Sequence, residues 1–239
     1  MNQSPPDIHS SSDDYISRFL NAGGKFLLNK QSQIISTIIT AYRLSLATAL
    51  DVGGGHFQSA PILAQAGIKV TITGSDYSCQ QQMLKTSPNA NIEFKVSSLC
   101  PLPFPEHSYD LVSTFRVLSH LDNFEDFIGE CCRVAKVAVI FDYPTTKSLN
   151  YLSRYFFKTK LAVEKNTRTF NSFSDNQIKE LLAKNGFQIK QIERELFWPH
   201  FLHRAVNNKL LSNIIEKPAE IFGITQRFGS PVIVFATRV

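Results

Sequence analysis

Short apolar runs alternate with segments of helical character over residues 46–144, and this alternation constrains the fold more than any other feature. We expect strands at 46–52, 69–76, 91–96, 109–115 and 136–144. Helices are expected at 57–67, 78–87 and 123–135, with Pro88 closing the second and Asn123 capping the third. Strands that alternate with helices predict a parallel sheet with helices on both faces. The runs are apolar nearly throughout, as expected of strands covered on both sides.

The alternation resumes near the end of the chain. A helix with Ser174 as its N-cap and Gly186 at its stop precedes a sixth strand at 188–197, and a final strand follows at 230–239. Two insertions, 146–173 and 198–229, interrupt the pattern, and long excursions of this kind are often lids or substrate-binding segments.

The N-terminal region differs in composition from the rest. Residues 1–13 are rich in Pro, Ser and Asp and predict a disordered tail. Residues 14–45 predict helices, with "AGGK" at 22–25 separating a short helix from a longer one. We therefore expect a single domain over 14–239, with its ligand-binding core at 46–145.

Composition limits the possible partners and compartments. The net charge of +5 comes from basic residues that are spread along the chain, so we expect no stable nucleic-acid partner. The sequence contains no apolar run of the ~18 residues that span a bilayer, and the polar N-terminus is unlike a signal peptide. The four cysteines form no CxxC pair, which predicts reduced thiols, no metal site and a cytoplasmic location.

The stretch "ALDVGGGHF" at 49–57 places three glycines directly after the first strand. Ligands of doubly wound sheets bind at the carboxyl ends of the strands, and glycine lets the backbone approach a ligand closely. A tight turn with no ligand is the plainer interpretation. A dinucleotide fingerprint would need glycine at Gln58, which argues against a nicotinamide cofactor. Asp51 before the turn suits an ammonium group, and Asp76 after the second strand suits ribose hydroxyls, so the pattern favours a nucleoside with a cationic tail.

Several motifs together resemble the class I S-adenosylmethionine-dependent methyltransferases, in their quinone-biosynthesis-like, small-molecule branch. The resemblance covers about residues 45–145 and rests on "ALDVGGGHF", "VTITGSDYS", "PLPFPEHSYDLV" and "FRVLSHLDNFEDFIGECCRV", with "LLAKNGFQI" beyond them. It implies S-adenosylmethionine as the cofactor. It also implies a Rossmann-like sheet of seven strands, mostly parallel with an antiparallel C-terminal strand, and helical insertions that act as a lid.

The resemblance also implies roles for individual residues. The cofactor-binding set would be Asp51, Gly53, Gly54, Gly55, Asp76, Tyr77, Ser98, Leu99, Phe115 and Arg116. Three features depart from the family pattern. Ser98 stands where many relatives carry Asp, the bulky His56 and Phe57 follow the glycines, and no Pro-Gly-Gly turn precedes the fifth strand.

The implied reaction depends on aligning the donor with the acceptor rather than on a catalytic triad, because the methyl group of the donor is already activated. Such positioning can lower the reaction barrier by about 7–11 kcal/mol. His120 is a candidate general base, and local packing explains it equally well. Asp110 starts a strand and is interpreted as structural, whereas Asp142 ends one near the ligand. Candidate substrate contacts are Tyr143, Tyr155, His200 and Arg204.

The predicted acceptor is the O or C nucleophile of a small organic molecule. Two alternatives stay open at this point. The basic charge would suit an RNA or protein acceptor, and the departures at Ser98 and His56 would suit a protein that keeps the fold without catalysis.

Overall fold

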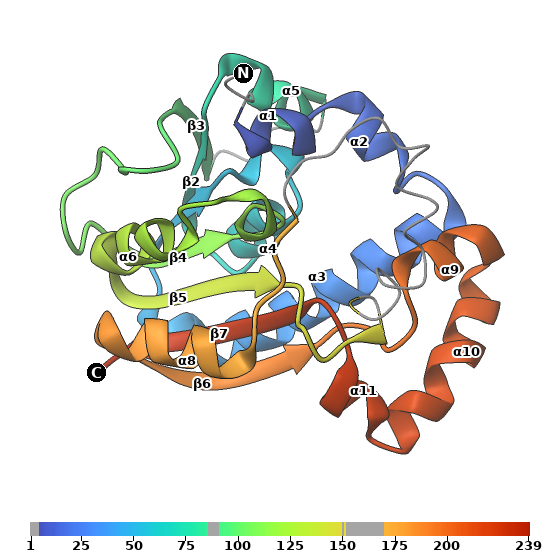
Figure 1. Ribbon diagram of the computed structural model, residues 1–239. Helices are drawn as coiled ribbons and strands as arrows, with labels where there is room; N and C mark the ends of the chain where they lie inside the picture. The colour runs from blue at the N-terminus through green and yellow to red at the C-terminus, as the bar shows by residue number, and fades with distance from the viewer. Residues whose placement is uncertain (1–4, 86–90, 150, 152–169) are drawn as a thin grey trace.

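A seven-stranded sheet forms the centre of the molecule in the computed structural model, which describes residues 5–85, 91–149, 151 and 170–239 (Figure 1). The strand order is β3-β2-β1-β4-β5-β7-β6. Strand β7 is antiparallel to both of its neighbours, and the other neighbouring pairs are parallel. The fold class predicted from the sequence is thereby confirmed. The strands are β1 (Thr48–Val52), β2 (Lys69–Gly74), β3 (Ile92–Val96), β4 (Tyr109–Thr114), β5 (Ala135–Tyr143), β6 (Phe187–Arg194) and β7 (Val232–Arg238).

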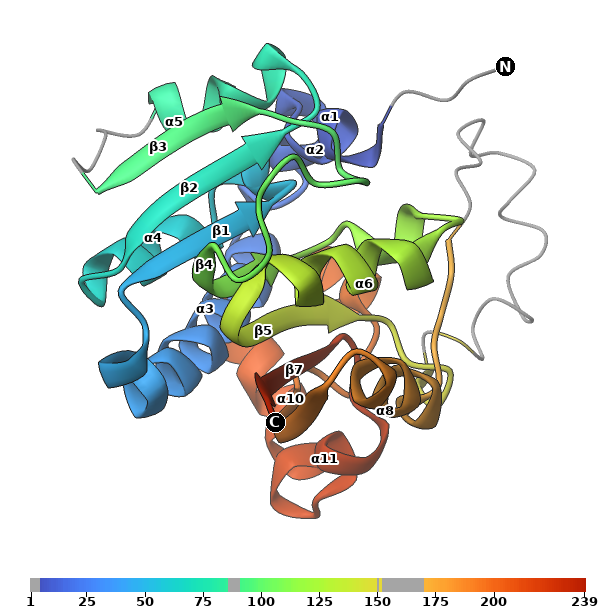
Figure 2. The same cartoon turned by 90° about the vertical axis from the view of Figure 1, so that its left-hand side faces the viewer.

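Helices cover both faces of the sheet, which explains why its strands are apolar on successive residues (Figure 2). On one face, α6 (Phe124–Val134) and α8 (Asp175–Lys184) pack against alternate strand residues such as Leu50. On the other, α3 (Ala22–Tyr42) and α4 (Ser59–Gln65) pack against the intervening ones such as Ala49. Both residues are fully buried, so β1 carries two apolar faces.

The helix ends follow local chemistry. The Ser174 hydroxyl accepts a hydrogen bond from the Gln177 amide at 3.1 Å and caps α8, as predicted. Gly186, at φ +77°, follows the end of that helix. Asn123 occupies the cap position of α6, but its side chain makes no cap hydrogen bond, and its carbonyl accepts from Phe127 instead. The second predicted helix begins as a 3-10 turn (Tyr77–Gln80) that leads into α5 (Gln81–Lys85), and Pro88 lies outside the described residues.

The N-terminal segment corrects the sequence prediction. Residues 6–13 are not a disordered tail, because they form α1 (Pro6–Ser10) and the start of α2 (Asp13–Ser17). The Asp7 side chain is fully buried and accepts hydrogen bonds from Ser75. Ser75 lies 68 residues further along the chain, so the composition of the N-terminal segment could not reveal this contact.

The glycine pair at 23–24 was also misinterpreted. Helix α3 begins at Ala22 with Asn21 as its cap, so "AGGK" lies inside its first turn. A Cβ on Gly23 would lie 2.0 Å from the His203 carbonyl oxygen. The glycine is therefore needed for the close approach of α9 (His200–Val206), not for a break between helices.

The second insertion continues from α9 into α10 (Lys209–Ile221) and α11 (Ile224–Phe228), and the three helices form an arm beside α3 (Figure 1). Most of the first insertion, including Tyr155, falls outside the described residues. In the part of the chain that the structure describes, no helix is both long enough and apolar enough to cross a bilayer.

Candidate active site

The glycine turn bends the backbone sharply after β1. Gly53 has φ +68°, a 3-10 turn follows over Gly54–His56, and Phe57 has φ +57°. A Cβ on Gly54 would lie 2.2 Å from Asp51 Oδ2, and one on Gly53 would lie 2.7 Å from a methyl carbon of Val117. Position 53 thus requires glycine because its φ is positive, and positions 53 and 54 both require glycine because a side chain there would clash with its neighbours.

Asp51 lies buried under this turn. Its carboxylate accepts hydrogen bonds from the Ser59 hydroxyl of α4 at 2.6 Å and from the Ser113 hydroxyl of β4 at 2.7 Å. Burial raises the pKa of Asp51 to about 6, and the two hydroxyls offset part of that rise. The residue therefore connects the turn to the next helix and to the neighbouring strand.

Asp76 occupies the predicted position at the end of β2. Its side chain is exposed, and Oδ1 accepts a hydrogen bond from the Ser78 amide at 2.8 Å. That amide lowers the pKa of Asp76, so the group is ionised at neutral pH. Tyr77 beside it is 77% exposed. An ionised, accessible carboxylate next to an exposed ring suits the recognition of a nucleoside.

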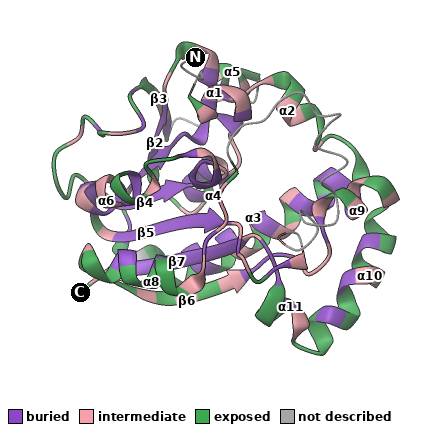
Figure 3. Cartoon of the chain, viewed as in Figure 1, coloured by how far each residue is buried: buried purple, intermediate pink, exposed green. Residues whose placement is uncertain are grey.

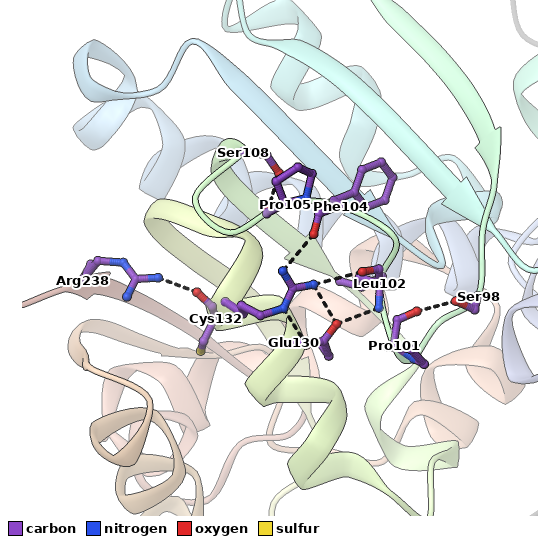
Figure 4. A network of polar contacts seen from close by, with 10 residues as sticks. Ser98, Pro101, Leu102, Phe104, Pro105, Ser108, Glu130, Cys132 and Arg238 are labelled. Carbon is purple, nitrogen blue, oxygen red and sulfur yellow. Dashed lines mark hydrogen bonds and ion pairs between the residues drawn. The ribbon is translucent and has the colours of Figure 1, made fainter.

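The loop over residues 97–108 carries Ser98 and Leu99, and it is held against α6 (Figure 4). Arg133 donates to the carbonyls of Leu102 and Phe104, while its partner Glu130 accepts from the Leu102 amide. Leu99 is 8% exposed and approaches the Gly53 position. The Ser98 hydroxyl donates to the carbonyl of Pro101 in its own loop.

Helix α1 covers the glycine turn from the solvent side. Asp7 accepts hydrogen bonds from the Ser75 amide at 2.6 Å and from the Ser75 hydroxyl at 2.7 Å. A Cβ on Gly53 would lie 3.5 Å from that of Asp7, and one on Gly55 would lie 2.1 Å from the Ser11 hydroxyl oxygen. The N-terminal segment is thus part of this site.

A second cluster surrounds Arg116, which follows β4 in the left-handed conformation at φ +61°. Its amide donates to Asp142 Oδ1 at 2.7 Å, and its Nη2 donates to Gln31 Oε1 at 3.1 Å. The Phe19 ring centre lies 4.4 Å from the guanidinium. A non-glycine residue with positive φ is costly and is frequent at functional sites, so Arg116 marks this cluster as a candidate.

Gln31 of α3 joins two buried carboxyl groups. Its Nε2 donates to Glu195 Oε1 at 2.6 Å and lies 3.4 Å from Asp142 Oδ2. Burial raises the pKa of both acids, and the charge of Asp142 contributes to a pKa of about 8 for Glu195. Two close carboxyl groups in a dry site do not both ionise readily, so Glu195 holds a proton near neutral pH.

Two imidazoles lie within the electrostatic reach of Arg116. Burial lowers the pKa of His56 and of His200 to about 3, and the Arg116 charge adds to both shifts. Both rings are therefore neutral. Hydrogen bonds with the backbone of Gly54 and Phe115 offset part of the pKa shift of His56. Within the described parts of the chain, Nε2 of His200 has no hydrogen-bond partner. Unpaired buried polar atoms are uncommon and call for an explanation.

Other predicted site residues are not brought to this cluster. Phe115 is 1% exposed and belongs to the apolar core. Tyr143 is also buried, and its hydroxyl donates to Asp175 of α8 at 3.0 Å, because it faces the opposite side of the sheet from Asp142. The prediction of Tyr143 as a substrate contact is therefore not supported.

The remaining predicted residues divide between structural and peripheral positions. His120 ends a 3-10 turn (Leu118–His120), with its ring centre 5.6 Å from that of Phe170. Arg204 is half-buried on α9. Asp110 accepts from the amides of residues 47 and 48, which confirms its structural role.

Sequence reasoning missed Asp7, Gln31 and Glu195. A faint signal existed for Glu195, which is a charged residue at the end of an expected strand. No local pattern distinguishes Gln31 from the other polar residues of its helix, or Asp7 from those of its segment.

Comparisons with known proteins agree with this geometry. A family model described as a methyltransferase domain matches residues 50–141. A protein of Mycolicibacterium smegmatis named "Probable S-adenosylmethionine-dependent methyltransferase" is 25% identical over 150 residues, which are 63% of this chain. The match spans about half of that relative, 55% of its length.

Solved structures share the fold at low sequence identity. The magnesium protoporphyrin IX methyltransferase of Synechocystis PCC 6803, with bound SAH, has a TM-score of 0.64 at 17% identity, covering 97% of both chains. An S-adenosylmethionine-dependent methyltransferase of Thermotoga maritima has a TM-score of 0.66 at 15% identity, covering 98% of both. The family match over residues 50–141, the relative and the shared fold all indicate a class I S-adenosylmethionine-dependent methyltransferase, as the sequence motifs predict, with S-adenosylmethionine as the cofactor.

The residues present fit that cofactor. The glycine turn provides a backbone without side chains of its own beneath the N-terminal segment, Asp51 provides a buried negative charge, and Asp76 provides an accessible carboxylate for ribose hydroxyls. Asp7 and Ser11 lie against the same turn, so the N-terminal segment covers the backbone expected to hold the cofactor.

Proposed function

We propose that this methyltransferase transfers a methyl group from S-adenosylmethionine to the O or C nucleophile of a small organic acceptor bound beside Arg116. The observation that carries the proposal is the buried pair of Asp142 and Glu195, joined through Gln31 and capped by Arg116, at the carboxyl ends of the strands. Ligands of doubly wound sheets bind at this edge.

The acceptor cluster lies next to the residues expected to hold the cofactor. Val117, whose methyl group approaches Gly53, directly follows Arg116 in the chain. His56, in the glycine turn itself, is subject to the charge of Arg116. The two halves of the proposed site therefore meet at residues 116–117, as an in-line displacement requires of its two reactants.

The bound cofactor would supply a methyl group already activated by a positive sulfur. The chain's own residues orient the acceptor and take up its proton. The acceptor's proton would pass to Asp142, whose pKa is raised by burial and whose neighbour Glu195 already holds a proton near neutral pH. His120 stays the weaker candidate for this role.

Enclosure favours a small acceptor over RNA or protein. Gln31, Asp142 and Glu195 are 2%, 6% and 2% exposed, and Phe19 covers the guanidinium of Arg116. A polymer could not reach these carboxyl groups without a large opening, whereas a small molecule could be surrounded by them.

The proposal is tested with S-adenosylmethionine labelled in its methyl group. The purified chain is incubated with a panel of phenols, enols and carboxylic acids, with a protein-free small-molecule extract, and with total RNA. Label is expected in the small-molecule fraction in a form stable to mild acid. Label that appears in RNA or protein alone would contradict the proposal, as would turnover that is lost only on substitution of surface lysines.

A further inference from the structure

The arm formed by α9, α10 and α11 exposes several large apolar side chains, which together we call the outer face of the arm. Leu210 is 73% exposed, Ile214 64%, Ile221 71% and Phe222 79%. Contiguous exposed apolar residues on a soluble protein mark an interaction surface more often than single ones do. The full set is Phe201, Leu210, Leu211, Ile214, Ile221, Phe222 and Phe228.

Helix α10 turns its polar side inward, the reverse of an ordinary surface helix. Its buried residues are Ser212, Glu216 and Ala219, whereas Leu210, Ile214 and Ile221 are exposed and recur at helical spacing. Figure 3 shows buried and exposed stretches following one another along α10. Packing against the core therefore does not account for the apolar residues of this helix.

Hydrogen bonds fix this orientation. Glu216 Oε1 lies 2.9 Å from His203 Nε2 and accepts from the Trp198 amide at 2.9 Å, and Oε2 accepts from the Phe197 amide at 3.0 Å. Rotating α10 to bury its apolar residues would break these bonds and leave a carboxylate unpaired, which is costly. The apolar face is thus held outward by the fold.

The charges on the arm indicate what covers it. Lys209, Lys217 and Arg227 are exposed. The arm holds two acids: Glu216 is buried, and Glu220 pairs with Lys30. An outward apolar face with basic residues around it is the pattern of a helix that lies in the interface of an anionic bilayer.

We propose that the outer face of the arm docks on a membrane surface that contains anionic lipids. The apolar residues enter the boundary between headgroups and acyl chains, with Ile221 and Phe222 at the junction of α10 and α11, while the basic side chains meet the headgroups. A second copy of the chain is the disfavoured occupant, because a two-fold contact through this face would bring like charges together. The inference is independent of the acceptor proposed above.

The test is flotation of the full chain with lipid vesicles. Vesicles of phosphatidylcholine and phosphatidylglycerol in equal parts should carry at least about ten times more protein than vesicles of phosphatidylcholine alone, and added salt should reduce that binding. The double variant I214S/F222S should lose at least about tenfold of the binding. Leu84→Ser, which alters a side chain 67% exposed on α5, is the matched control and should bind as the original chain does.

A charge variant separates the electrostatic contribution to membrane binding from the contribution of the apolar side chains. K209E/K217E should lose the preference for phosphatidylglycerol, whereas Lys190→Glu on the exposed side of β6 should keep it. Titration with S-adenosylhomocysteine checks that every variant keeps its fold. Flotation at background level for the original chain would overturn the proposal. Sedimentation velocity in which I214S/F222S turns a dimer into a monomer would instead assign the face to a second copy.

Discussion

The cofactor half and the acceptor half of this site are built in different ways. On the cofactor side, Asp51, the glycine turn and Asp76 each follow directly from the end of a strand. On the acceptor side, Gln31 comes from α3, Asp142 from β5 and Glu195 from the residue after β6, and the three meet through hydrogen bonds across the fold. Local backbone geometry therefore determines the first half, and tertiary packing determines the second.

The largest effect is expected in the cofactor half. Gly54→Ala would place a methyl group 2.2 Å from Asp51 Oδ2 and displace that carboxylate, so affinity for S-adenosylhomocysteine should fall by about 100-fold or more. Isothermal titration measures it. Gly129→Ala on α6 is the matched control, because its Cβ would meet only Asn185 Oδ1 at 3.5 Å. Equal affinity of both variants for S-adenosylhomocysteine would show that the turn is not part of the cofactor site.

The second prediction tests whether the acceptor half can be impaired while the cofactor half still binds its ligand. Asp142→Asn should lower methyl transfer to the acceptor found in the labelling experiment by about 10²–10⁴-fold, the range for loss of a general base. Affinity for S-adenosylhomocysteine should change by less than about threefold, since Asp142 does not contact the glycine turn. Asp126→Asn, an exposed acid on α6, controls for charge. A fall in cofactor affinity as large as the fall in turnover would contradict the division into two halves.

The third prediction concerns stability and pH. The pKa of Glu195 is about 8 in the folded chain and near the ordinary 4.5 when unfolded, so between these values the native state binds the extra proton. The free energy of unfolding should therefore fall as pH rises from 5 to 8, by up to about 1.4 kcal/mol per pH unit from this group. Glu195→Gln should flatten that slope. Urea unfolding at pH 5, 6.5 and 8 measures it, and a slope unchanged by the substitution would refute the assignment.

The smallest effect is expected at α1. Asp7→Ala removes the acceptor for two hydrogen bonds from Ser75, which should cost about 1–3 kcal/mol of stability for this segment. Because the segment covers the glycine turn, S-adenosylhomocysteine should associate several-fold faster, as stopped-flow fluorescence of the single Trp198 can record. Asp14→Ala, whose partner Arg18 is exposed, serves as the control. Slower association in Asp7→Ala would show that α1 helps to hold the ligand.

These differences explain what the sequence could predict. The positions of Asp51, Gly53 and Asp76 follow from strand ends and glycine chemistry, which are local. Asp142 and Tyr143 are adjacent, yet they face opposite sides of β5, and only the packing of α3 and α8 shows which side carries the site. Gln31 and Asp7 gain their importance from partners far along the chain, so no window of sequence contains the reason for their burial.

The position of α1 also bears on how this protein is handled at the bench. A fusion partner or affinity tag joined ahead of α1 would be attached to the segment that holds Asp7 against Ser75 and covers the glycine turn, so we expect it to alter cofactor uptake. Val239, at the other terminus, is 91% exposed, and a tag attached there leaves the glycine turn untouched.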